Sequence, residues 1–62
     1  MTDTQIIASY IAGTARSKDN RGRYQNQLWC YRALLPNTTP TIAMLCAQAA
    51  RAVGETIARR AA

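Results

Sequence analysis

The last third of the chain constrains the fold most, because its pattern is that of one long helix. Pro36 and Pro40 bracket a short turn, and Thr39 stands where a helix N-cap would lie, directly before a proline at the first helical position. Apolar residues then recur at helical spacing and form one stripe: Ile42, Cys46, Ala49, Val53 and Ile57. Arg59 and Arg60 fall in the last turn, where the helix dipole favours cations. The sequence therefore predicts a helix from about Pro40 to about Arg60.

A second stripe, made of small residues, lies beside this Ile/Val stripe on the helical wheel. Its members form the Ala/Gly stripe: Ala43, Ala47, Ala50, Gly54 and Ala58. The two stripes together cover more than half of the helix circumference, which is more than one packing partner can bury. We interpret the Ile/Val stripe as the intramolecular core and the Ala/Gly stripe as a dimer or target contact, because small residues let another backbone approach closely. The alternative is that the Ala-rich face is solvated and only favours helix formation.

The first half of the chain allows two interpretations. Residues 5–16 and 23–35 contain β-branched and aromatic residues that suit strands, and the segment from Asp19 to Gly22 fits a type I turn in a hairpin loop. We therefore expect an α+β fold, a β-hairpin over these two segments followed by the C-terminal helix (ββα). The alternative is an all-α fold, a three-helix or helical-hairpin bundle. It is supported by another stripe at helical spacing: Tyr24, Leu28, Tyr31 and Leu35.

The segment between the two expected strands is strongly basic. Its positive side chains would gather at the tip of the hairpin: Arg16, Lys18, Arg21 and Arg23. The helix adds Arg51, Arg59 and Arg60, and these seven residues are the candidate nucleic-acid-binding residues. Arg and Lys side chains at such a tip can hold the phosphate backbone. The alternative is that the charges keep the end of a hairpin soluble and discourage edge-to-edge pairing.

Length and charge indicate a chain that associates with an anionic partner. A single small domain of 62 residues buries only roughly 60% of its unfolded surface, so we expect a partner, such as a second copy in a homodimer. Eight Lys and Arg side chains against three Asp and Glu give a net charge of +5. This surplus favours nucleic acid or an acidic protein surface.

Several classes of function are excluded by what the sequence lacks. There is no His, the three acidic residues are scattered, and the glycines are isolated, so we expect no catalytic site, no metal site, no cofactor and no small-molecule substrate. Two cysteines without His cannot form a four-ligand zinc site in one chain, and buried thiols are the simplest interpretation. The alternative is a disulfide, which would need an oxidising compartment. No segment reaches the length of a membrane helix or has the basic start of a secretory leader. We therefore expect a cytoplasmic protein.

Two functional hypotheses remain. The main one is a small non-enzymatic protein that binds nucleic acid through the basic tip, with affinity that falls steeply with salt. The alternative is a protein-binding module, an inhibitor or an assembly or accessory factor of the kind that phages and mobile elements encode. It would act through an apolar helix face and an aromatic cluster, and its candidate interface residues are Trp29, Tyr31, Ala43, Ala47, Ala50, Gly54 and Ala58.

Overall fold

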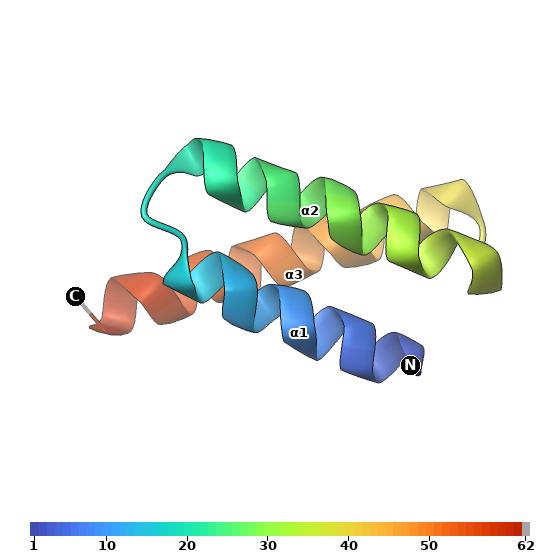
Figure 1. Ribbon diagram of the computed structural model, residues 1–62, viewed down its shortest axis with the longest axis horizontal. Coiled ribbons are helices and arrows are strands. Elements are labelled where there is room, and N and C mark those ends of the chain that lie inside the picture. Colours follow the sequence, from blue (N-terminus) through green and yellow to red (C-terminus); the bar gives the residue numbers. More distant parts are fainter. Residues whose placement is uncertain (62) are drawn as a thin grey trace.

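The computed structural model describes residues 1–61 and folds them into three α-helices. These are α1 (Asp3–Arg16), α2 (Asn20–Leu34) and α3 (Pro40–Ala61), with a short 3-10 turn η1 (Leu35–Asn37) between α2 and α3. Figure 1 shows α1 and α2 side by side in front of α3, and each helix contacts both others. No strand occurs among the described residues, so the β-hairpin prediction is wrong and the all-α alternative is confirmed.

Local capping explains why the first predicted strand is a helix. Thr2 and Gln5 form a capping box, in which the Thr2 hydroxyl accepts the Gln5 N–H at 3.2 Å and the Gln5 side chain accepts the Thr2 N–H at 2.9 Å. This exchange satisfies two backbone donors that would otherwise be unpaired at the helix start. The β-branched residues of α1 are tolerated because tertiary packing overrides their weak preference for strands.

The predicted hairpin turn is instead the connection between α1 and α2. The Asp19 carboxylate accepts the Gly22 N–H at 2.8 Å and caps α2, which begins at Asn20. Asp is favoured both at the first position of a type I turn and at a helix N-cap, so the residue type alone does not separate the two structures. Gly22 lies in the first turn of α2, with negative φ, rather than in a left-handed loop position.

The C-terminal helix agrees with its prediction at the N-terminal end. It begins at Pro40, and the Ile42 N–H donates to the Thr39 hydroxyl at 3.4 Å, as expected for an N-cap before a proline. The helix extends one residue beyond the predicted end, to Ala61.

The core reverses the roles that we assigned to the two stripes of α3. The buried apolar residues are Ile6, Cys30, Leu34, Ala43, Ala47 and Ala50. Gly54 is also buried, so the inward face of α3 is the Ala/Gly stripe and not the Ile/Val stripe. The reason is the size of the facing side chains: α1 and α2 supply the bulky groups, and small residues on α3 allow the three helices to pack closely around them.

Candidate interaction surfaces

The outer side of α3 carries large aliphatic side chains that the fold does not bury. Ile42, Leu45, Val53 and Ile57 are 48%, 56%, 47% and 45% exposed. In contrast, every buried residue of α3 is Ala or Gly. Burying a Val, Leu or Ile side chain fully contributes about 1.5–3 kcal/mol, so covering the exposed half of each would stabilise the chain by roughly 1 kcal/mol per side chain. This surface is therefore the strongest candidate for a contact with another molecule.

A shallow groove between α1 and α3 extends this surface. Its volume is about 180 Å³, and its lining consists of Ile7, Ile11, Cys46, Ala49, Ala50 and Val53. All these side chains are apolar or carry sulfur, and all except Ala50 are half-buried or exposed. We call the part of this surface around the groove the apolar face, and it consists of Ile7, Ile11, Ile42, Cys46, Ala49, Val53 and Ile57. Leu45 lies about 100° around the helix from Cys46 and is not counted in it.

The other side of α3 forms a polar groove with α2. Its volume is about 440 Å³, and Tyr24, Gln27, Arg51 and Glu55 are among its lining residues. The Arg51 guanidinium donates to Glu55 Oε1 at 2.8 Å and to Gln27 Oε1 at 3.1 Å, so it joins α3 to α2. The other cation of the groove, Arg59, lies 4.0 Å from Glu55 Oε2. Because Arg51 is held by Glu55 and Gln27, it has a structural role, although the sequence places it among the nucleic-acid-binding candidates.

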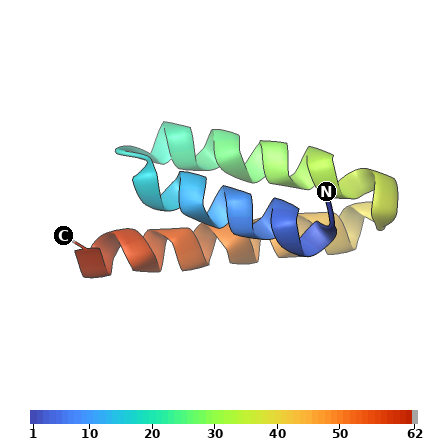
Figure 2. The same ribbon diagram turned by 60° about the horizontal axis from the view of Figure 1, so that its bottom comes forward.

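Most of the predicted basic residues meet at one end of the bundle. The connection between α1 and α2 lies at the same end as the C-terminus of α3 (Figures 1 and 2). This basic end contains Arg16, Lys18, Arg21, Arg23, Arg59 and Arg60. The six cations of the basic end and the acidic Asp19 in its connection leave a surplus of five positive charges. The other two cations, Arg32 and Arg51, are equal in number to the other two acids, Asp3 and Glu55, so the basic end carries the net charge of +5.

Local structure already accounts for part of this charge. Arg16, Arg59 and Arg60 lie in the last turns of α1 and α3, where cations offset the helix dipole. The Arg23 guanidinium donates to the Ser17 carbonyl at 3.4 Å and to the Asn20 side chain at 3.5 Å, and its Nε is buried with no hydrogen-bond partner among residues 1–61. Arg23 therefore fastens the connection rather than projecting from a hairpin tip.

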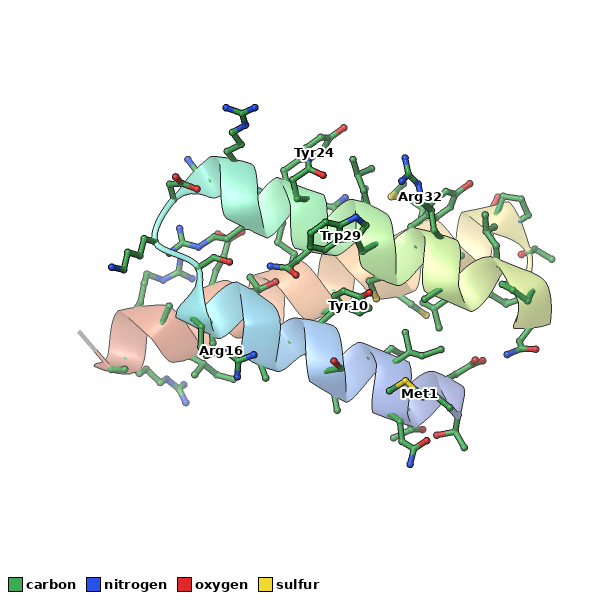
Figure 3. All side chains as sticks on the ribbon, in the orientation of Figure 1. Met1, Tyr10, Arg16, Tyr24, Trp29 and Arg32 are labelled. Carbon is green, nitrogen blue, oxygen red and sulfur yellow. The ribbon has the colours of Figure 1, made fainter. Side chains whose placement is uncertain are left out.

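The aromatic candidates separate from one another in the structure. Trp29 is 49% exposed, and Figure 3 shows its ring on the side of α2 that is turned toward α1. Tyr31 is half-buried and packs against the core. No residue of α2 lines the groove between α1 and α3, so Trp29 is outside the apolar face.

The predicted interface residues of α3 are placed inside the molecule. Ala43, Ala47, Ala50 and Gly54 are buried against α1 and α2, and Ala58 is half-buried. A methyl group on Gly54 would come within 2.6 Å of Thr14 Cβ, which shows how closely α3 approaches α1. The sequence-based prediction of this interface is thus corrected: the Ala/Gly stripe makes the intramolecular contact, and the Ile/Val stripe is the one left available.

The two cysteines occupy different environments. Both thiols are free, with Cys30 buried in the core and Cys46 partly exposed in the groove of the apolar face. Burial, and then the nearby Cys46 thiol, raise the pKa of the Cys30 thiol. Cys30 is therefore a core residue, whereas Cys46 can report on whether the apolar face is covered.

Comparisons with known proteins do not identify the chain. No protein-family model, curated protein or solved structure matches it. Within residues 1–61, no helix has both the length and the apolar content that crossing a lipid bilayer requires. The candidate function therefore depends on the surfaces described above.

Proposed function

We propose that this chain is a small non-enzymatic protein-binding module that acts through the apolar face. The observation that supports it is the inverted burial of α3, which buries Ala and Gly while Ile42, Val53 and Ile57 remain about half exposed. Large apolar surfaces left on a small domain mark contact sites for other molecules. A domain of this size gains a large share of its stability from a partner that binds only the folded state.

The shape of the apolar face favours a helix as the bound element. It lies along two neighbouring helices and contains a groove of about 180 Å³ into which apolar side chains can insert. An amphipathic helix binds such a groove through anchors spaced one turn apart. The face carries no ionised side chain, so its specificity would come from shape and from charges at its rim, where Arg60 lies at the C-terminal end of α3.

The charge of the basic end supports the same proposal in a different way. A net charge of +5 at one end would orient a bound helix along the bundle, because that end attracts acidic groups of a partner and repels basic ones. A cytoplasmic location belongs to this proposal, and the free thiols of Cys30 and Cys46 agree with a reducing compartment.

The test is affinity capture with matched variants. Val53→Glu places a carboxylate in the apolar face at a half-exposed site, so the fold should survive while binding is lost. Gln48→Glu adds the same charge on α3 in the polar groove and serves as the control. A protein captured by the unmodified chain and by Gln48→Glu, lost with Val53→Glu, and retained after nuclease treatment supports the proposal. Equal capture by both variants contradicts it.

A second candidate function, nucleic-acid binding, is favoured by one observation. Arg16, Lys18 and Arg21 are exposed at the basic end, which also contains the exposed Arg59 and Arg60. These side chains could bind phosphates, and the affinity would then fall steeply with salt. We place this candidate second because helix ends and the connection already account for several of the same charges.

A further inference from the structure

The α3 residues of the apolar face are arranged symmetrically along the helix, whereas the exposed Leu45 lies outside this face. Counted from the peptide bond between Ala49 and Ala50, Cys46 and Val53 lie at equal distances on either side, as do Ile42 and Ile57. All except Ala50 belong to the apolar face, and Ala50 lines its groove. The large side chains are thus at the two ends and the small ones at the centre.

This arrangement matches what an antiparallel pair of identical helices requires. In a twofold-symmetric contact, residue i of one copy faces residue j of the other, and residue j faces residue i. With the axis near Ala49, Ile42 would face the second copy's position 57, and Cys46 would face its position 53. The small central residues would let the two helices approach closely, and the larger ones would interlock at both ends over roughly 22 Å.

The charge distribution selects the antiparallel direction. The basic end, with its net charge of +5, includes the C-terminus of α3, so a parallel pair would bring two such ends together. An antiparallel pair would separate them by about the length of the 22-residue helix, roughly 33 Å, which is several times the Debye length of about 8 Å at physiological salt. Of the four charged residues of α3, Arg51 and Glu55 are bonded to each other on the side of α2 and do not enter the contact. The other two, Arg59 and Arg60, lie in the last turn, beyond Ile57.

From these observations we infer that the apolar face binds a second copy of this chain, with the two α3 helices antiparallel about a twofold axis near Ala49. The inference rests on the proposed function, because it takes the apolar face to be a protein contact and names the partner. It also assigns Cys46 to the interface, opposite the second copy's position 53. Apart from Ala50, which lines the groove, the Ala/Gly stripe stays within each copy, where Ala43, Ala47 and Gly54 are buried.

The first experiment measures mass in solution by sedimentation equilibrium across a concentration series. The unmodified chain, at 6.8 kDa, is expected to approach twice this mass as concentration rises. Val53→Glu is expected to remain at the mass of one chain, with the same helical circular dichroism, and Gln48→Glu to dimerise as the unmodified chain does. A monomer at every concentration, or a dimer that Val53→Glu leaves intact, overturns the inference.

The second experiment determines the direction of the pair with a short thiol cross-linker. In a Cys46→Ala background, in which the remaining native thiol, Cys30, is buried, Ala49→Cys is expected to cross-link because it lies next to the axis. Ile42→Cys alone is expected to give no cross-linked dimer, and Ile42→Cys combined with Ile57→Cys is expected to give one. Efficient cross-linking of Ile42→Cys alone shows a parallel pair and overturns the inference.

Failure of this inference and failure of the proposed function are distinguishable. A chain that stays monomeric but captures another protein in a manner that Val53→Glu abolishes overturns only the assignment of the second copy. A chain that is monomeric, and whose captured proteins or nucleic acids are unaffected by Val53→Glu, contradicts the proposed function as well.

Discussion

Replacing Gly54 with Ala adds one methyl group where α3 lies against the backbone of α1. That carbon would stand 2.6 Å from Thr14 Cβ, 2.8 Å from Thr14 Cγ2 and 2.9 Å from the Ile11 carbonyl oxygen. Ordinary carbon–carbon contact is at about 3.5 Å, so the closest pair is about 0.9 Å too near. Rotation of the Thr14 side chain can move its Cγ2 but neither its Cβ nor the Ile11 carbonyl. The two helices must therefore move apart.

Two opposing contributions determine the expected loss of stability. Ala is favoured over Gly in a helix interior by about 1 kcal/mol. Overpacking a core costs typically 1–3 kcal/mol, and the upper end applies here because backbone atoms are involved. We therefore expect Gly54→Ala to lower the free energy of unfolding by about 2 kcal/mol. In a domain of this size, that change corresponds to a melting temperature lower by roughly 8–16 °C.

Thermal and urea unfolding followed by circular dichroism would test this expectation, with all chains at one concentration because association affects stability. Gly22→Ala is the matched control, since its methyl group would lie 3.3 Å from Ser17 Oγ and 3.4 Å from both Asp19 Oδ1 and Ser17 Cβ, with no backbone atom among these nearest neighbours. We expect the free energy of unfolding of this control to lie within about 1 kcal/mol of that of the unmodified chain. If Gly54→Ala is as stable as the unmodified chain, then the argument that close packing of α3 on α1 leaves no room for a methyl group at position 54 is wrong.

The cap of α2, the core thiol and the basic end each provide a further test. Asp19→Ala removes the acceptor of the 2.8 Å bond from the Gly22 N–H and should lower the free energy of unfolding, measured in urea, by about 1 kcal/mol. Asp19→Asn keeps a side-chain oxygen at the cap and should retain most of the stability of the unmodified chain. Equal stability of the unmodified chain and both variants would contradict the capping role. The pKa of the Cys30 thiol is raised in the folded chain above its ordinary value of 9.0, so the contribution of the neutral thiol to stability is complete below that pH and is lost as the pH rises through the folded pKa. Above about pH 9.0, the unfolding free energy of Cys30→Ala should therefore decline less steeply with pH than that of the unmodified chain. The same decline in both chains would count against the burial of the thiol. If the basic end binds duplex DNA, replacing Arg16, Lys18 and Arg21 with Ala should reduce the slope of log K against log salt by about 2.7 in fluorescence anisotropy titrations, and an unchanged slope would exclude these three side chains as phosphate contacts.

The start of a helix can be predicted from the sequence where the residues that cap it fit no other local structure. Thr39 before Pro40 is a helix-start signal, and α3 begins there. The same kind of signal, Thr2 followed by Gln5 three positions later, precedes α1 and indicates a helix start that the strand interpretation of residues 5–16 does not use. These signals work because they depend on contacts within four residues, which neighbouring helices do not change.

The connection between the first two helices could not be assigned in this way. Asp19, Asn20 and Gly22 satisfy both a hairpin turn and the first turn of a capped helix. The hairpin turn and the capped helix differ in what the segments on either side of them pack against. Ile6, Cys30 and Leu34 meet the small face of α3 in one core only when both segments are helical.

The sequence alone determined that this chain has one long C-terminal helix with two apolar stripes, a net charge of +5 and no recognisable catalytic or metal-binding pattern. Only the tertiary structure decided which stripe is buried. Both stripes have the same helical period, so the pattern cannot rank them. The choice depends on the volume that α1 and α2 bring to the contact, and their bulky side chains fit against Ala and Gly, which leaves Ile42, Val53 and Ile57 exposed for a partner.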